Sequence, residues 1–340
     1  MFPREPGTGG VRESLRVLME LSPAQPAHTT QPLLTAAIES ARIVVALADR
    51  KSDTLLLALS SDEYDQPLVL KVYDEMHPGQ GRSIGRASRE ADALLRLEQA
   101  DVCVPGLVAS GERALLRRYV EGPVVRDLHW DVALARRLAE WVFRCHSALS
   151  VGAIDAACLH RDAHATGDAH ASGAAHASGA AHASSDADTT GPAHHGLGRS
   201  WLVGDMNLGN FVLDVASGRL CGIDLGDTMI GDPLDDVGEG CMRIIGRRPG
   251  FTADRWACAL AFASWYGRLA TDVRYVLSEV PKRASASFRK MAVWRSDPFM
   301  AEIADAFPVL WREALLSLET STTASETAGP PQDGGCLLSR

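Results

Sequence analysis

Three side chains with oxygen donors lie close together in the stretch 201–226. Asp205 and Asn210 are five positions apart, and Asp224 follows in the next apolar run. There is no His or Cys among the three, and oxygen-only donors suit a hard cation such as Mg²⁺. The stretch therefore contains a candidate metal site, provided that local structure brings the three side chains together.

Two short apolar runs could do so. Residues 212–213 and 221–223 have the composition of strands, and the turn residues Ala216-Ser217-Gly218 lie between them. A hairpin of this kind places the first two donors at one end, with Asp224 leaving the second strand beside them. We therefore expect the three donors to converge.

Lys71 is a second unusual residue, because it stands inside the apolar run 68–73. A buried ammonium group requires a partner. Glu90 is the candidate, since it lies at the edge of the apolar face of a helix predicted over 84–99. Taken alone, each could be an ordinary surface residue. Taken in order with the three later donors, they become candidate site residues.

Apolar periodicity divides the chain into two lobes. We predict an α+β fold with a small antiparallel five-stranded sheet and one helix in the first lobe, and a larger, mainly helical second lobe. The expected strands are 43–47, 54–59, 67–73, 106–109 and 114–120, and the later helices begin at 131 and cover 233–245, 252–270, 273–277 and 298–318.

The predicted lobes cover 41–122 and 123–318, preceded by a variable leader over 1–40 and followed by a Ser/Thr/Gly/Pro-rich disordered tail over 319–340. Residues 160–197 contain Ala-His-Ala-Ser-Gly-Ala units, whose recurrent glycines and small side chains predict a disordered insertion. A sharper alternative is weak transition-metal capture by its histidines in an extended conformation.

The composition limits the class of protein. With 340 residues, 46% hydrophobic and 23% charged, a folded two-lobed protein is expected. The net charge of −9 argues against broad nucleic-acid binding. No apolar run approaches a membrane span, and the first residues lack a secretion signal. The seven cysteines form no CxxC pair, so we expect reduced thiols in a cytoplasmic protein.

The order of these residues resembles the protein-kinase-like superfamily. Asp205 and Asn210 match its D-x-x-x-x-N catalytic loop, and Asp224 matches the metal-binding aspartate that follows. The G-D-x-x-x-G-N form of 204–210 and the G-D-P-x-x-D form of 231–236 further resemble aminoglycoside, choline and related small-molecule phosphotransferases. Lipopolysaccharide-core sugar kinases share much of this pattern. The resemblance covers about 43–245 without the His-rich tract.

The resemblance implies an ATP- and Mg²⁺-dependent phosphotransferase that moves the γ-phosphate to a hydroxyl of a small molecule or sugar. The first lobe would then bind the nucleotide. Lys71 would bind the α- and β-phosphates and be fixed by Glu90, while Asn210 and Asp224 would hold Mg²⁺. Asp205 would orient the acceptor hydroxyl.

Further implied roles belong to the segment after the last strand of the first lobe. The stretch 118–122 would be the hinge between the lobes, where Tyr119, Val120 and Glu121 contact adenine. Asn207 stands where this branch often has His or Lys near the transferring group. Its amide donates a hydrogen bond but neutralises no charge.

Two departures from the family pattern motivate an alternative, a weak or inactive pseudokinase or nucleotide-binding module. The turn 48–53 has no glycine to approach phosphates, and Val203 replaces a histidine that supports the site in the family. A protein Ser/Thr kinase is the other alternative. It is disfavoured because no Ala-Pro-Glu follows Asp224 and the G-D-P element comes early.

The residues after Asp224 leave two interpretations open. The acidic residues there are compatible with a cationic acceptor, or with a solvated and capped helix start: Asp227, Asp232, Asp235, Asp236 and Glu239. For the element at 232–235 we favour the cap, with Asp232 at the N-cap and proline at the first helical position. His146 is predicted to be a packing and hydrogen-bonding residue.

Overall fold

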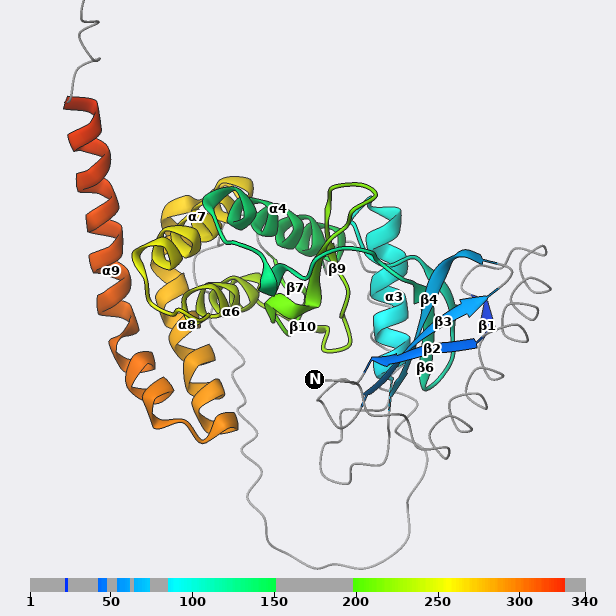
Figure 1. Ribbon diagram of the computed structural model, residues 1–340. Coiled ribbons are helices and arrows are strands. Elements are labelled where there is room, and N and C mark those ends of the chain that lie inside the picture. The colour runs from blue at the N-terminus through cyan, green and yellow to red at the C-terminus, as the bar shows by residue number, and fades with distance from the viewer. Residues whose placement is uncertain are drawn as a thin grey trace, which may run out of the picture.

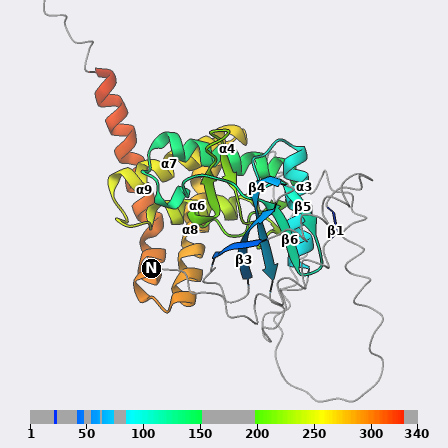
Figure 2. The ribbon, with the colours of Figure 1, turned by 45° about the vertical axis from the view of Figure 1, so that its right-hand side comes forward.

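The computed structural model describes residues 22–23, 42–47, 54–61, 64–73, 85–150 and 198–327. A sheet flanked by one helix forms one part of the molecule, and a group of helices forms the other (Figure 1). The same division is seen after a turn of 45° (Figure 2). The α+β architecture with a small sheet lobe and a larger helical lobe agrees with the prediction.

The sheet of the first lobe contains β1 (Ser22–Pro23), β2 (Arg42–Leu47), β3 (Thr54–Ser61), β4 (Tyr64–Tyr73), β5 (Leu107–Ser110) and β6 (Ala114–Arg118). All neighbours are antiparallel, in the order β1-β5-β6-β4-β3-β2. The predicted number of five strands is corrected by β1, which lies inside the predicted leader. A two-residue strand is too short to show a periodic pattern.

Helix α3 (Arg86–Gln99) brings Glu90 to the sheet. Its buried face is made by residues at helical spacing: Ala87, Glu90, Ala91, Leu94 and Leu97. Glu90 was predicted at the edge of this face and is instead completely buried. On β4, Lys71 is paired with Leu56 of β3 and Leu115 of β6. A charged residue thus lies between two apolar strands.

The predicted hairpin is present as β8 (Phe211–Leu213) and β9 (Leu220–Gly222), which pair antiparallel. A second pair, β7 (Ser200–Leu202) with β10 (Met229–Gly231), was not predicted. Strands β7 and β10 are separated by the whole segment 203–228, so no local turn marks their pairing in the sequence. The β7–β10 pair joins the two ends of the segment 203–228, and the hairpin β8–β9 lies within that segment.

The second lobe contains α4 (Val132–Ala148), α6 (Pro233–Ile245), α7 (Ala253–Leu269), α8 (Val273–Arg295) and α9 (Pro298–Thr327), with short turns η1 (Val125–Asp127) and η3 (Leu208–Asn210). Helix α6 packs against α7 and α8, and α4 packs against α7. The last helix continues nine residues past its predicted end at 318. Among the helices that the structure describes, none is both long and apolar enough to cross a bilayer.

The prediction that the fourth helix ends at 277 is wrong, because α8 continues through Pro281 to Arg295. Proline has no N–H to donate to the carbonyl four residues earlier. In this helix that carbonyl belongs to Leu277, and it accepts a hydrogen bond from Trp311 Nε1 of α9 at 3.2 Å. Tertiary contact therefore supplies the hydrogen bond that proline removes.

Several predictions fall on other parts of the chain. The His-rich insertion over 160–197, the glycine-free turn at 48–53 and most of the predicted leader and tail lie outside the described residues. Of the cysteines in the described part, four are buried and Cys103 is partly exposed, and all of them are free thiols. This agrees with the predicted reduced state.

Candidate active site

Lys71 connects the two lobes at the centre of the candidate site. Its Nζ lies 2.7 Å from Glu90 Oε2 and 2.8 Å from Asp224 Oδ1. The lysine side chain is only 2% exposed. The structure thus brings together three residues that are 19 and 153 positions apart in sequence. The predicted Lys71–Glu90 pair is present, and Asp224 joins it.

Glu90 has more partners than the sequence suggested. Arg117 of β6 donates from Nη1 to Glu90 Oε1 at 3.1 Å, and the Tyr73 hydroxyl donates to Oε2. The Leu225 amide approaches Oε1 at 3.4 Å. The carboxylate therefore links β4, β6 and the segment after β9. A buried carboxylate with two cationic partners meets the requirement that buried charges be paired.

Asp224 carries its charge in a partly buried setting. Burial raises the pKa of its carboxyl, but the Lys71 ammonium and, more weakly, Arg117 outweigh this effect and hold the pKa well below its usual range. The Gly226 amide also donates to Asp224 Oδ1, at 3.1 Å. A side chain at Gly226 would collide with the Tyr73 hydroxyl. The glycine therefore allows the loop to approach Lys71.

The loop that carries Asp205 begins at Gly204, which has a φ of 79°. This left-handed conformation favours glycine, and a side chain there would also collide with the carbonyl of Asp227. Asp205 Oδ1 then accepts from the Asn207 amide at 3.2 Å. The side chain of Asp205 is 13% exposed. The Gly-Asp pair recognised in the sequence thus has a conformational reason.

Asn210 and Asn207 have different orientations. Asn210 Nδ2 donates to the backbone carbonyl of Asp205 at 3.1 Å. The backbone carbonyl of Asn210 accepts from the Ile223 amide at 2.8 Å. Asn210 is thereby placed beside the strand that leads to Asp224. Asn207 Oδ1 instead accepts from the Gly209 amide at 3.1 Å and caps the turn η3. In this arrangement the Asn207 side chain serves its own loop.

The donor chemistry of Asn210 and Asp224 fits magnesium. An amide oxygen and a carboxylate are both hard oxygen ligands, and Mg²⁺ in nucleotide sites takes its remaining ligands from phosphates and water. In the part of the chain that the structure describes, no group of three or more His, Cys, Asp and Glu side chains could hold a metal ion. Any such ion at these two residues would need ligands from a bound substrate.

Asp236 supports the loop from behind and was not predicted to do so. Its carboxylate accepts from the Val203 amide at 2.6 Å and the Gly204 amide at 3.2 Å. His146 Nε2 lies 3.0 Å from Asp236 Oδ2, and His146 Nδ1 lies 2.9 Å from the Tyr266 hydroxyl. His146 is buried, as predicted for a packing and hydrogen-bonding residue. A histidine from α4 thus reaches the loop that has valine at 203.

Replacing Asp236 by asparagine is expected to destabilise the protein. The amide keeps one acceptor oxygen for two backbone N–H groups and removes a buried charge, so we expect a loss of about 1–3 kcal/mol in the free energy of unfolding. Urea unfolding of both proteins measures this loss. Asp254→Asn is the matched control, because Asp254 is exposed on α7. Equal stability of the two variants would contradict the role of Asp236.

The hinge segment offers one residue to a nucleotide base. The Tyr119 amide donates to the Pro67 carbonyl, and the Glu121 carbonyl accepts from the Val215 amide, both at 2.9 Å. Val120 lies between them, and its backbone groups have no hydrogen-bond partner among the described residues. Of the three residues predicted to contact adenine, Val120 therefore has the most available backbone.

The acidic residues after Asp224 each have a partner within the protein. Asp227 pairs with Arg86 at 2.8 Å, and Arg283 pairs with Asp232 at 2.6 Å and Asp235 at 2.7 Å. Asp236 contacts His146, and Glu239 contacts Arg243. Asp232 also caps α6, with proline at the first position, as predicted. The capped helix start that the sequence favoured for 232–235 is therefore present.

Three arginines of the site were not predicted. Arg117 contacts Glu90 and also donates to the Ile223 carbonyl, Arg86 contacts Asp227, and Arg243 contacts Asp205 at 3.0 Å. Arg86 and Lys71 also lie 5.1 Å and 4.9 Å from the centre of the Tyr73 ring. No motif marks these arginines, because each belongs to an otherwise ordinary strand or helix.

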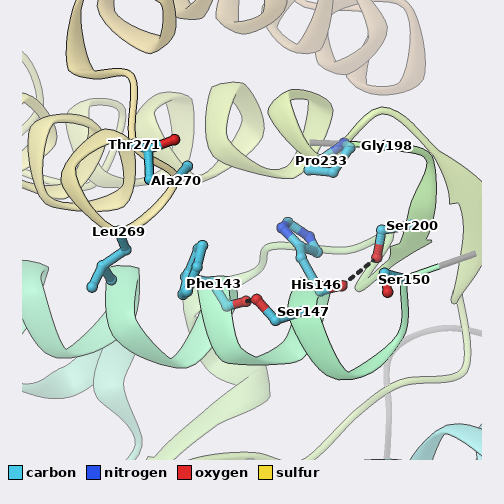
Figure 3. Close-up of a pocket in the computed structure, with 10 residues that line it drawn as sticks. All are labelled: Phe143, His146, Ser147, Ser150, Gly198, Ser200, Pro233, Leu269, Ala270 and Thr271. Atoms are coloured by element: carbon cyan, nitrogen blue, oxygen red, sulfur yellow. Dashed lines mark hydrogen bonds between the residues drawn. The ribbon is translucent and has the colours of Figure 1, made fainter. Parts of the chain in front are cut away.

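A pocket of about 250 Å³ lies elsewhere, between the end of α4, the start of α6 and the end of α7 (Figure 3). His146, Ser200 and Pro233 contribute to its wall, and Ser200 Oγ donates to the His146 carbonyl at 2.9 Å. None of the predicted site residues lines it. The pocket is therefore separate from the group around Lys71 and Asp205.

The arrangement can be compared with known proteins. No protein-family model and no curated protein sequence matches the chain. Among solved structures, a Plasmodium vivax ethanolamine kinase is 9% identical, with a TM-score of 0.51 over 86% of this chain and 85% of that one. An amicoumacin kinase is 13% identical, with a TM-score of 0.49 over 89% of each chain.

The similarity to the ethanolamine kinase concerns the fold. The chain has a protein-kinase-like fold, as the order of its residues predicted. At this level of identity the comparison says nothing about the reaction or the acceptor. The reaction and the acceptor depend on the side chains of the site.

Proposed function

We propose that this protein is an ATP- and Mg²⁺-dependent phosphotransferase that moves the γ-phosphate to a hydroxyl group of a small molecule or sugar. The observation that carries the proposal is the contact of Lys71 with both Glu90 and Asp224, at 2.7 and 2.8 Å. A buried ammonium held between two carboxylates from different lobes is well suited to bind phosphate oxygens. Structural stability alone gives no reason to place a lysine there.

The remaining residues would take the roles that the resemblance implies. Mg-ATP supplies the phosphoryl group, and the charge of Mg²⁺ offsets that of the phosphates. Asn210 and Asp224 would hold the metal, and Lys71 would bind the α- and β-phosphates. Asp205 would accept a hydrogen bond from the acceptor hydroxyl and direct it towards the phosphorus. The backbone of Val120 would contact adenine.

The support of the loop favours an enzyme over a pseudokinase. Val203 is one of the two departures that motivated the pseudokinase alternative, since the family has a histidine there. Asp236 accepts hydrogen bonds from the amides of Val203 and Gly204, and His146 contacts the same carboxylate. The loop is therefore held in place without a histidine at 203.

Nucleotide binding tests the first step of this proposal. We expect Mg-ATP to stabilise the wild-type protein by about 2.7 kcal/mol at a concentration one hundred times its Kd. Asp224→Asn should remove the Mg²⁺-dependent part of this effect, whereas Asp254→Asn, on the exposed start of α7, should not. Thermal unfolding of the wild type and the two variants with ATP, with and without Mg²⁺, measures the stabilisation and its Mg²⁺-dependent part.

Transfer to an acceptor tests the second step. Wild-type protein is incubated with γ-labelled ATP and a panel of sugars, amino alcohols and aminoglycosides, with water as the background acceptor. Labelling of a small molecule supports the proposal. Labelling of proteins in a mixture, with no small acceptor used, would favour a protein kinase. Stabilisation by Mg-ATP without any transfer would favour a nucleotide-binding module.

A further inference from the structure

Arg243 is a cation that contacts Asp205, although no sequence motif pointed to it. Its Nη2 lies 3.0 Å from Asp205 Oδ1, and the two residues are 38 positions apart. The side chains of Arg243 and Asp205 are 19% and 13% exposed. Exposed ion pairs contribute little because water and salt screen them. This pair is largely shielded, so its geometry has a larger effect.

Glu239 holds Arg243 in place on α6. Both Nε and Nη2 of Arg243 donate to Glu239 Oε1, at 3.1 and 2.7 Å. The two residues are one helical turn apart, and the helix is packed against α7 and α8. Burial raises the pKa of the Glu239 carboxyl, and Arg243 opposes that rise. A planar guanidinium bonded through two nitrogens has little freedom, so it offers Asp205 a donor in a fixed position.

Asn207 does not supply a charge at this point. Its side chain accepts a hydrogen bond from the Gly209 amide and caps the turn η3. An amide also carries no net charge. Arg243 of α6 forms an ion pair with Asp205. Helix α6 therefore brings a positive charge to Asp205 that the Asn207 side chain does not supply.

We infer that Arg243 is a positioning residue, which holds the Asp205 carboxylate in one orientation towards the acceptor hydroxyl and balances its charge. The inference rests on the proposed function. The bonds from Arg243 and from the Asn207 amide both end on Oδ1, which restricts rotation of the carboxylate. In phosphoryl transfer, orientation of the acceptor contributes more than proton abstraction, so a fixed carboxylate is what the reaction requires.

Steady-state kinetics test this role. Arg243→Met keeps an unbranched apolar stem and removes the guanidinium with its charge, and it should lower kcat by about 100-fold through misorientation of Asp205. The KM for Mg-ATP should stay unchanged, because Lys71 and Asp224 are untouched. Arg243→Lys should recover part of kcat, since an ammonium can replace one of the bonds. Wild-type kcat in Arg243→Met, or a raised KM alone, would overturn the inference.

Arg283→Met is the matched control. Arg283 also bridges two carboxylates at α6, Asp232 and Asp235, but it lies on α8 and does not contact Asp205. Loss of its ion pairs should lower the melting temperature and leave kcat at the wild-type value. An equal loss of kcat in both variants would show a general effect on α6 and would overturn the specific role of Arg243.

A second measurement does not depend on activity. Thermal unfolding of Asp205→Ala, Arg243→Met and the double variant forms a double-mutant cycle. If Arg243 acts through Asp205, the double variant should lose less in melting temperature than the sum of the two single losses. Additive losses would overturn the inference. Should the wild type transfer no phosphate to any acceptor, the proposed function fails, while this cycle still decides whether the two side chains are coupled.

Discussion

Asp205→Asn is expected to lower the rate of phosphoryl transfer by about 10²–10⁴-fold. The substitution keeps the size of the side chain and an oxygen that can accept from the Asn207 amide, which now lies 3.2 Å from Oδ1. It removes the negative charge that would attract and orient the acceptor hydroxyl. The predicted metal and phosphate residues lie elsewhere, so the affinity for Mg-ATP should change little.

Two measurements separate these effects. Transfer from labelled ATP gives kcat and KM, and thermal stabilisation by Mg-ATP gives binding. Asp214→Asn is the matched control, because it makes the same change in the exposed turn between β8 and β9. Loss of kcat with retained binding supports the role of Asp205. Unchanged kcat would assign the orientation of the acceptor to another group.

Much of this site could be predicted because its residues sit on patterned elements. Lys71 was conspicuous as a charge within an apolar strand, and Glu90 lay within reach on the following helix. The hairpin of 211–222 explained how Asp224 could meet Asn210, and the Ile223 amide does donate to the Asn210 carbonyl at 2.8 Å. In each case a local pattern limited the possible positions of a charged or polar residue.

The arginines could not be predicted because their local patterns are ordinary. Arg117 and Arg118 are consecutive on β6, so they must point to opposite faces. The sequence does not say which face is buried, and in the structure Arg117 is buried while Arg118 is exposed. Arg243 follows Glu239 by four positions, the spacing of many solvent-exposed helical pairs. Its contact with Asp205 depends on how α6 packs, which is a property of the whole lobe.

The same reasoning explains the errors in the fold. Helix α8 was ended too early because Pro281 interrupts a helical pattern, and only the contact of Trp311 with the Leu277 carbonyl makes the longer helix acceptable. Strand β1 and the pair β7–β10 are defined by partners far away in the sequence. Short elements of this kind have no pattern of their own.

Glu90→Gln is expected to produce the largest loss of stability. The side chain keeps its volume and loses its charge, although Lys71 and Arg117 remain buried beside it at 2% and 6% exposure. Removing one member of a buried ion pair leaves an uncompensated charge and costs about 3–5 kcal/mol of unfolding free energy. Asp224 contacts Lys71 but forms no salt bridge with Arg117 among the described residues. Its presence therefore compensates only in part.

Urea unfolding of the wild type and of Glu90→Gln measures this loss, and Glu98→Gln is the matched control. Glu98 lies on the same helix two turns later and is exposed, so its replacement should change the stability by no more than about 0.5 kcal/mol. Equal stability of the two variants would mean that water or movement of Lys71 compensates for the charges left on Lys71 and Arg117. The Glu90 carboxylate would then position Lys71 and would not hold the two lobes together. In that case the stability and the KM for Mg-ATP would depend on different residues.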